Sequence, residues 1–185
     1  MRTPLRALAV TVSNRAAAGV YEDRGGPLLV ALLAEAGCEV GDPVVVPDGE
    51  PVEAALRSAI ASGYDVVVTT GGTGISPSDR TPEMTARVLD REIVGIAETI
   101  RAVGRAAVPA AVLSRGLAGV SGRTLIVNLP GSPGALRDGM GVLAPLLAHV
   151  ASQLAGEDHG SGEHTSGGHA SGGHGSIGHG SGGTP

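Results

Sequence analysis

A glycine-rich loop and two aspartates are the residues of this sequence best suited to chemistry on phosphate groups. Gly71, Gly72 and Gly74 leave three of four positions without a side chain, which lets backbone N–H groups approach an anion closely. Asp48 and Asp79 lie in loops after predicted strands, where two facing carboxylates can hold Mg²⁺ directly or through water. Taken singly, each aspartate is explained about as well by a turn or by helix capping.

The segments on either side of the glycine loop would position it. Residues 66–70 form a β-branched run typical of a buried strand. After the loop, Thr81 is a good N-cap, Pro82 suits the first helical turn, and Glu83 lies where a helix favours negative charge. An open α/β sheet usually binds anions at such a connection. For this motif alone, an ordinary glycine-rich turn is an equally good interpretation.

Strand and helix patterns alternate along the rest of the chain. Strands are predicted over residues 5–12, 40–46, 66–70, 109–113 and 124–129. Helices are predicted over residues 28–36, 52–62 and 82–105, the last broken near Gly95, and a helical pattern runs on to Ala155 with a break at Pro145. Residues 116–122 are expected to be a mobile connection. The order predicts an α/β fold: a single three-layer domain with a mostly parallel sheet and helices on both faces.

Polar residues follow several of these strands. They are Ser13, Asp48, the loop 71–83, Ser114 and residues 128–132. The carboxyl ends of parallel strands gather at one edge of a sheet. We therefore expect five loops to build one composite site.

Composition excludes several classes of function. Residues 1–156 carry 13 arginines and 15 acidic residues, which argues against binding to nucleic acid or to a membrane surface. The chain has no Phe or Trp, so aromatic stacking is nearly excluded, and the single Cys38 rules out an intrachain disulfide. The apolar run near the start is too short for a signal peptide, so a cytoplasmic location is expected.

The last segment differs in composition from the rest. We expect a domain over residues 1–156 and a disordered tail rich in Gly, Ser and His over residues 157–185. Imidazoles recur at every fifth position and could bind a transition metal: His159, His164, His169, His174 and His179. A solvated tail without a role is at least as good an interpretation.

Several spaced motifs together resemble a known family. They are residues 69–74, Asp79, and residues 81–83, 113–115 and 128–133, with residues 12–15, Asp23, Gly26 and residues 46–48 fitting the same pattern in order. They resemble the molybdopterin adenylyltransferases of the Mog/MoaB type, also found as the G domain of gephyrin-like proteins. The likeness spans roughly residues 5–156 and looks closest to the Mog branch of high-GC actinobacteria.

The resemblance implies a function. Such enzymes are usually homotrimers; they bind molybdopterin and Mg-ATP, transfer AMP to the terminal phosphate of the pterin and release pyrophosphate. A molybdate-insertion enzyme then takes the product. The alanine-rich helical face from Ala97 to Ala107 could pack between subunits.

The resemblance also assigns residues. It implies catalytic roles for Asp48, Asp79 and Ser114, with Mg²⁺ on the two aspartates. It implies substrate or nucleotide binding by a larger set: Ser13, Asp23, Gly26, Gly71, Gly72, Thr73, Gly74, Thr81, Pro82, Glu83, Arg115, Asn128, Pro130, Gly131 and Ser132.

The sequence departs from the family pattern at two informative places. Ser13-Asn14 stands where Ser-Asp is frequent, and Ser78-Asp79-Arg80 stands where Arg-Asp-Val is frequent, so the cation that contacts the substrate phosphate is left open. Two alternatives also stay open: a molybdopterin-binding scaffold without catalysis, and the related domain of competence-damage proteins, which usually carry a further catalytic domain. The paired aspartates favour the enzyme, since binding alone needs no metal carboxylates.

Overall fold

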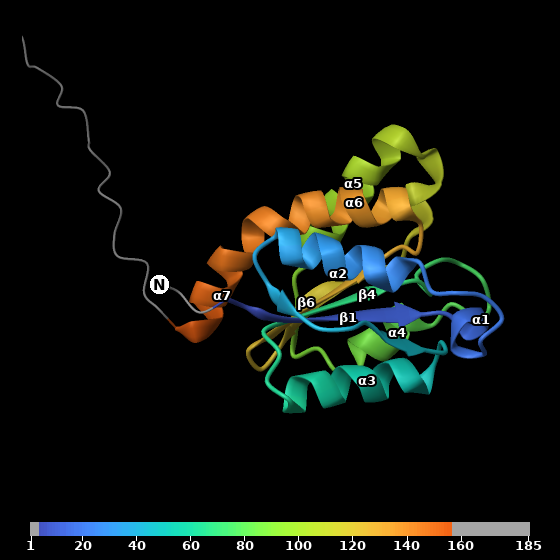
Figure 1. Cartoon of the computed structure of the whole chain (residues 1–185). Coiled ribbons are helices and arrows are strands. Elements are labelled where there is room, and N and C mark those ends of the chain that lie inside the picture. Colours follow the sequence, from blue (N-terminus) through green and yellow to red (C-terminus); the bar gives the residue numbers. More distant parts are fainter. Residues whose placement is uncertain (1–3, 157–185) are drawn as a thin grey trace, which may run out of the picture.

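The structure is a computed structural model that describes residues 4–156. A sheet lies between two layers of helices, which confirms the expected three-layer α/β domain (Figure 1). One face is covered by α2 (Gly25–Glu35), α5 (Val94–Ala107), α6 (Pro133–Leu143) and α7 (Leu147–Ala155). The other face is covered by α3 (Glu50–Ala61) and α4 (Thr81–Ala86), and the short α1 (Asn14–Ala17) lies at one end of the sheet.

The sheet has seven strands and is mostly parallel. They are β1 (Arg6–Val12), β2 (Glu39–Val40), β3 (Val44–Val46), β4 (Val66–Thr70), β5 (Arg91–Glu92), β6 (Ala118–Ser121) and β7 (Thr124–Leu129). The order is β2-β1-β4-β7-β6-β5, and β3 also pairs with β1. Pairs among β1, β2, β3, β4 and β7 are parallel, whereas β6 runs antiparallel to both β7 and β5.

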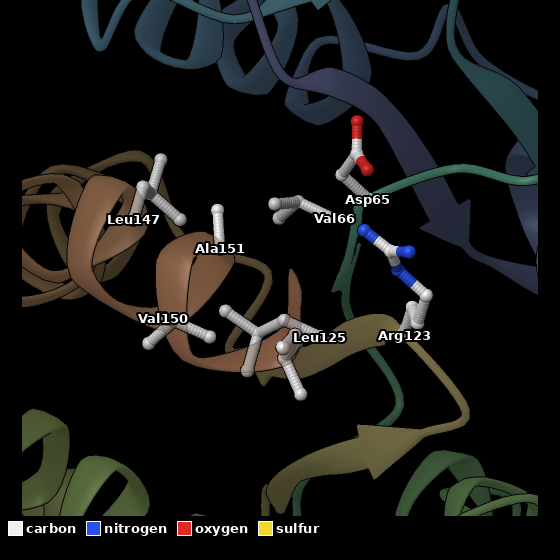
Figure 2. Close-up of a pocket in the computed structure, with 8 residues that line it drawn as sticks. Asp65, Val66, Arg123, Leu125, Leu147, Val150 and Ala151 are labelled. Carbon is white, nitrogen blue, oxygen red and sulfur yellow. The ribbon is translucent and has the colours of Figure 1, made fainter. Parts of the chain in front are cut away.

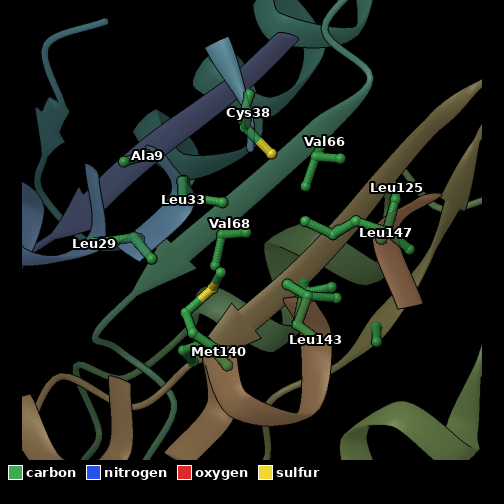
Figure 3. Packing of buried hydrophobic residues seen from close by; sticks show 14 of the residues in the cluster. Ala9, Leu29, Leu33, Cys38, Val66, Val68, Leu125, Met140, Leu143 and Leu147 are labelled. Carbon is green, nitrogen blue, oxygen red and sulfur yellow. The ribbon is translucent and has the colours of Figure 1, made fainter. Parts of the chain in front are cut away.

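Alternation of side chains along the central strands creates a core on each face of the sheet. In β4, Val66 and Val68 face the layer of α2, α5 and α6, whereas Val67 faces α3 and α4. Figure 3 shows Leu29 and Leu33 of α2 beside Val68, with Met140 and Leu143 of α6 nearby. Because no Phe or Trp is present, aliphatic residues with Met and Cys38 fill both cores.

Two expectations for residues 109–122 were wrong. The predicted strand over 109–113 is a 3₁₀-helix, η1 (Pro109–Leu113), because Pro109 has no N–H to donate to a sheet. The predicted mobile connection holds β6, which forms a hairpin with β7 through Gly122 at φ 55°. Gly119 lets β6 lie against β5, since a Cβ there would be 2.4 Å from the carbonyl oxygen of Arg91.

Other boundaries also shifted. The strand predicted over 40–46 is divided into β2 and β3 at Pro43, which cannot donate a ladder hydrogen bond. The helix predicted over 82–105 breaks before Gly95, because the N–H groups of Asp90 and Ile93 donate to Val120 and Ala118 of β6. The break at Pro145 is confirmed by a 3₁₀ turn, η2 (Ala144–Leu146).

Two further expectations concern the chain as a whole. Within residues 4–156, no helix is long and apolar enough to cross a membrane. The expected tail over 157–185, with its five spaced histidines, lies outside the residues that the structure describes.

The contact between β5 and β6 yields the first prediction. We expect Gly119→Ala to lower the free energy of unfolding by about 1–3 kcal/mol, because its Cβ would overlap the backbone of β5. Denaturant unfolding followed by circular dichroism measures the change.

Gly141 provides the matched control. It lies in α6, and a Cβ there would meet nothing within 4 Å. Gly141→Ala should therefore raise stability by about 0.5–1 kcal/mol, because alanine favours the helix. Equal stability of Gly119→Ala and the wild type would contradict the close approach of the two strands.

Candidate functional site

The loops expected to converge do lie at one edge of the sheet. Ser13 follows β1, Asp48 follows β3, the glycine loop follows β4, and Pro130 follows β7, all at the carboxyl ends of parallel strands. Ser114 joins them from the end of η1, with its hydroxyl 3.4 Å from that of Thr73. A cavity of about 520 Å³ opens beside the glycine loop.

Glycine is required at the start of this loop by close approaches on both sides. Gly71 has φ 99°, and a Cβ there would be 2.3 Å from the carbonyl oxygen of Val12 at the end of β1. Gly72 has φ 63°, and its Cβ would be 2.2 Å from Oδ2 of Asp48 and 2.3 Å from Oγ1 of Thr81. Both glycines thus have a steric reason that does not depend on a ligand, and Gly72 brings the loop against Asp48.

Only one of the two carboxylate oxygens of Asp48 accepts hydrogen bonds from the backbone. Its Oδ1 accepts hydrogen bonds from the amides of Gly49 at 2.7 Å and Arg80 at 3.1 Å, and its own amide donates to Asn14 at 2.9 Å. Burial raises the pKa of Asp48, those two amides lower it, and the negative charge of Asp79 raises it again. The two carboxylates therefore interact electrostatically, although they come from different loops.

Asp79 and Thr81 complete the surroundings of this carboxylate. Oδ2 of Asp79 accepts a hydrogen bond from the amide of Ser76 at 3.0 Å, and Asp79 lines the cavity. Thr81 is fully buried, and its Oγ1 is the one buried side-chain oxygen or nitrogen without a hydrogen-bond partner among residues 4–156. In that same part of the chain no three His, Cys, Asp or Glu side chains gather as a metal site. A cation here would therefore be held by two carboxylates and by ligand oxygens.

Arg115 ties the glycine loop to the helix that follows it. Its guanidinium donates to the carbonyl oxygens of Gly74 and Asp79, both at 2.7 Å, and pairs with the carboxylate of Glu83. Its amide donates to the carbonyl of Thr73 at 2.8 Å. The hydrogen bond from Arg115 lowers the pKa of Glu83. Arg115 and Glu83 thus hold the loop in which Asp79 lies.

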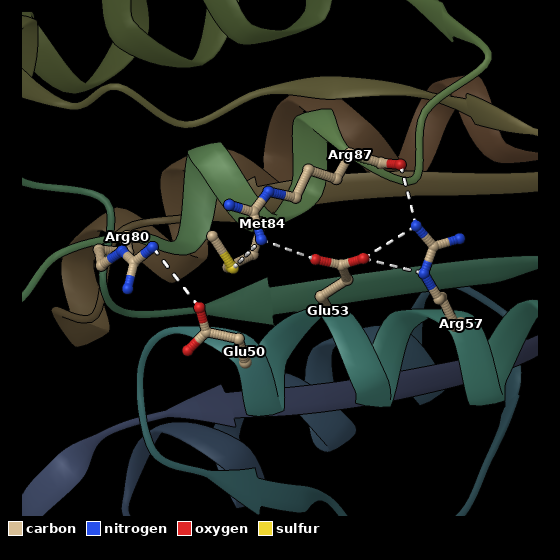
Figure 4. A network of polar contacts seen from close by, with 6 residues as sticks. All are labelled: Glu50, Glu53, Arg57, Arg80, Met84 and Arg87. Carbon is tan, nitrogen blue, oxygen red and sulfur yellow. Dashed lines mark hydrogen bonds and ion pairs between the residues drawn. The ribbon is translucent and has the colours of Figure 1, made fainter.

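The other arginine near the loop also points toward a carboxylate. Nη2 of Arg80 lies 3.8 Å from Oε1 of Glu50 at the start of α3. Figure 4 shows this pair beside a second one, in which Glu53 contacts Arg57 and Arg87. These contacts join α3 to Arg80 and Arg87, the residues on either side of α4. Asp48 lies two residues before α3, and Thr81 begins α4.

Several of the predicted binding residues have partners within the protein. Asn128 is 3% exposed; its amide donates to the hydroxyls of Thr69 and Thr85 at 3.0 Å and accepts from the N–H of Leu117. Asp23 accepts from the amides of Gly25 and Gly26 at the start of α2. These side chains support the loops from beneath.

Ser13 and Gly26 have similarly local contacts. The hydroxyl of Ser13 caps α1 and lies 2.9 Å from that of Tyr21. A Cβ at Gly26 would be 2.7 Å from both Pro43 and Thr11, so this glycine permits close packing of α2.

The predicted residues therefore divide into two groups. One group lines the cavity: Gly71, Gly72, Thr73, Gly74, Asp79, Ser114, Pro130, Gly131 and Ser132. The other group lies outside its lining: Ser13, Asp23, Gly26, Asp48, Thr81, Pro82, Glu83, Arg115 and Asn128.

An apolar wall of the cavity was missed from the sequence. It is formed by the end of α5, by η1 and by α6: Gly104, Ala107, Val108, Ala110, Ala111, Leu113 and Ala135, with Asp138 beside them. Treating residues 109–113 as a strand placed them inside the sheet. The sequence offered one signal, a group of aliphatic residues directly after the predicted helix. In the structure two of them are largely exposed, Val108 at 56% and Leu113 at 50%.

A second, much smaller crevice lies at the amino end of β4. Figure 2 shows Asp65, Arg123 and Leu125 facing Leu147 and Ala151 of α7. Its volume of about 20 Å³ suits a single water, so it is no candidate for a substrate site.

Comparisons with known proteins show which family the chain resembles. The model of a family described as "Probable molybdopterin binding domain" matches residues 8–149. The "Molybdopterin adenylyltransferase" of Haemophilus influenzae is 43% identical over 136 residues, which cover 70% of this chain and 68% of that protein. The chain spans about half the length of a "Molybdenum cofactor biosynthesis bifunctional protein" of Synechococcus elongatus, 39% identical over 157 residues that cover 84% of this chain and 49% of that protein.

Solved structures show the same likeness. "The structure of the Molybdopterin biosynthesis Mog protein from Mycobacterium ulcerans" is 49% identical and superposes with a TM-score of 0.77, covering 81% of this chain and 99% of that chain. A mycobacterial match supports the expected actinobacterial branch. With most of its described residues matched in sequence and in fold, the chain belongs to the family of probable molybdopterin binding domains, in its Mog/MoaB type.

Proposed function

We propose that this protein adenylylates molybdopterin with Mg-ATP in the biosynthesis of the molybdenum cofactor. One observation carries the proposal: Asp48 lies in the loop after β3, Asp79 lies in the glycine loop after β4, and the charge of Asp79 raises the pKa of Asp48. A module that only binds a pterin phosphate has no need of two interacting carboxylates beside an anion-binding loop. The Haemophilus influenzae relative named molybdopterin adenylyltransferase supports the same reaction.

The reaction needs positioning rather than an activated side chain. A terminal phosphate oxygen of molybdopterin attacks the α-phosphorus of ATP, and a new P–O–P bond forms. The bond from the α-phosphorus to the bridging oxygen breaks, and pyrophosphate leaves with that electron pair. Because the attacking oxygen is already anionic near neutral pH, the protein must mainly align two repelling phosphates.

The residues around the cavity suit this alignment. Backbone N–H groups of Gly72 and Gly74 would hold the pterin phosphate, with the hydroxyls of Ser114 and Ser132 as further donors. The N–H of Gly71 donates to the carbonyl oxygen of Leu129 at 3.0 Å, so Gly71 would shape the loop rather than bind the phosphate. The aliphatic wall of α5 and η1 would cover the pterin. The triphosphate would lie on the Asp48 side of the glycine loop. Ser13, Asp23, Gly26, Asn128 and Arg115 would act by holding these loops.

The residues present fit a magnesium ion. Asp48 keeps Oδ2 free of protein hydrogen bonds, Asp79 lies in the neighbouring loop, and the buried hydroxyl of Thr81 lacks a partner beside Asp48. Mg²⁺ is usually held by one or two carboxylates together with substrate phosphates, which is the donor set here. When bound, the ion would offset the negative charge of the phosphates.

The first prediction of this proposal concerns Asp79. We expect Asp79→Asn to lower the single-turnover rate of adenylylation about 100-fold, because it removes one negative charge near the cation while keeping the shape of the side chain. Rapid mixing with ATP, Mg²⁺ and molybdopterin, with pyrophosphate as the readout, measures the rate.

Asp42→Asn is a matched control, because it removes an exposed carboxylate from the turn between β2 and β3. Thermal melts check that each variant folds. If both aspartates hold one ion, replacing Asp48 and Asp79 together should raise the activation free energy by less than the sum of the two single replacements. A wild-type rate in folded Asp79→Asn would contradict the role of this carboxylate in holding the cation. A pterin-binding scaffold without catalysis would instead show no pyrophosphate release from the wild type.

A second prediction follows from the raised pKa of Asp48. A carboxyl whose pKa is raised on folding costs stability once it ionises, so the cost is present at neutral pH and disappears below pH 3.8, the ordinary value. Asp48→Asn keeps the acceptor Oδ1 and removes this cost. We therefore expect a melting temperature about 2 °C above that of the wild type at pH 7, without activity.

Magnesium gives the second readout for Asp48. Mg²⁺ should raise the melting temperature of the wild type and have a smaller effect on Asp48→Asn. A variant that melts below the wild type at pH 7 would show that the ionised carboxylate stabilises the protein.

The assembly state is a separate part of the proposal. We propose a cytoplasmic homotrimer that hands its product to a molybdate-insertion enzyme. Of the alanine-rich face expected to pack between subunits, Ala97 is buried in the core, whereas Ala102, Ala106 and Ala107 are exposed. Larger aliphatic side chains are also exposed on α5, on η1 and between them: Val94, Val103, Val108, Val112 and Leu113.

We expect light scattering at micromolar concentration to give three times the 18.2 kDa of one chain, since apolar patches of this kind mark subunit contacts. A stable monomer at that concentration would argue against the trimer.

A further inference from the structure

Asp138 differs from the other residues that line the large cavity. Only Asp79 and Asp138 are charged among the lining residues, and Asp79 lies in the glycine loop. Asp138 projects from α6 beside Ala111 and Ala135 of the apolar wall. A carboxylate at an aliphatic surface is poorly solvated unless donors face it.

Within residues 4–156, no donor satisfies this carboxylate. Asp138 makes no hydrogen bond or ion pair with another side chain or amide in that part of the structure. Arg101 lines the adjoining small crevice together with Asp138. Its guanidinium donates instead to the carbonyl oxygens of Gly116 at 3.1 Å and Ser114 at 3.5 Å. The two acceptor oxygens of Asp138 therefore lack a donor in this part of the structure, at a position that lines the cavity.

The position of Asp138 along α6 sets its distance from Ser132, at the end of the cavity proposed to bind the phosphate. Ser132 caps this helix, and Asp138 follows six residues later. At a rise of about 1.5 Å per residue, the two lie roughly 9 Å apart along the helix axis. A ligand that reaches both must be elongated, with an anion at one end and hydrogen-bond donors at the other.

Molybdopterin has these two ends. Its pyrimidine ring presents a 2-amino group beside a ring N–H, which are two parallel donors, and its phosphate lies at the opposite end. A carboxylate accepts two parallel N–H groups through its two oxygens, as it does from arginine. We infer that Asp138 binds the amino edge of the pterin and selects pteridines that carry this donor pair. The inference rests on the proposed substrate.

A pair of fluorescent probes tests the inference. Pterin has the 2-amino group, whereas lumazine has a carbonyl oxygen in its place. We expect the wild-type protein to bind pterin at least about ten-fold more tightly than lumazine, since a bidentate hydrogen bond to a charged acceptor is lost with lumazine. Fluorescence titration of the whole chain gives both dissociation constants.

The variants locate the effect at one carboxylate. Asp138→Asn should lower the preference for pterin about ten-fold, because its amide presents one donor where the carboxylate has two acceptors. We expect Asp138→Ala to lose the preference for pterin as well. This second variant keeps the test possible if Asp138→Asn does not fold. Glu98→Gln removes an exposed carboxylate from α5, outside the cavity lining, and should keep the wild-type ratio.

Each outcome is decisive. Equal binding of the two probes by the wild type, no binding of pterin, or an unchanged ratio in folded Asp138 variants would overturn the inference. Failure of the proposed adenylylation is a different result, because it appears as absence of pyrophosphate release from the wild type with molybdopterin and Mg-ATP.

Discussion

The backbone of Gly71 and Gly72 passes between the end of β1 and the side chains of Asp48 and Thr81, with no room for a Cβ at either position. This close approach depends on the parallel pairing of β4 with β1 and β7, which aligns their carboxyl ends. Nearly every feature of the site follows from it. The loop is drawn against Asp48, and the cavity opens where side chains are missing.

The contacts around this loop fix its shape at some cost in stability. Arg115 binds two carbonyl groups and Glu83, while Asn128 joins Thr69 to Thr85 beneath the sheet edge. Inside this frame the protein keeps two interacting carboxylates and an unpartnered buried hydroxyl. Such unfavourable groups persist at sites where a ligand or ion supplies the missing partner.

The absence of Phe and Trp shapes the other half of the cavity. Rings are commonly bound by aromatic stacking, which this wall of Ala, Val and Leu cannot provide. Aliphatic surface removes a ring from water without orienting it. A ring bound there would be oriented by the polar groups at the ends of the cavity, which are the glycine loop and Asp138.

Local patterns in the sequence determined the elements and the polar loops. The β-branched run over 66–70, the three loop glycines and the Thr81-Pro82 start of a helix depend on neighbouring residues, so each could be predicted and was found. The spaced motifs likewise identified the family. These features required no knowledge of distant contacts.

Tertiary structure decided what distant contacts control. The sequence predicted a break near Gly95, but its exact position and the pairing of β5 with β6 arise from backbone hydrogen bonds between segments far apart in sequence. The apolar wall arises because α5, η1 and α6 meet beside the glycine loop, which no local pattern announces. The burial of Asn128 and the open carboxylate of Asp138 were decided in the same way. A side chain's hydrogen-bonding groups are free or engaged according to what the fold places within about 3 Å of them.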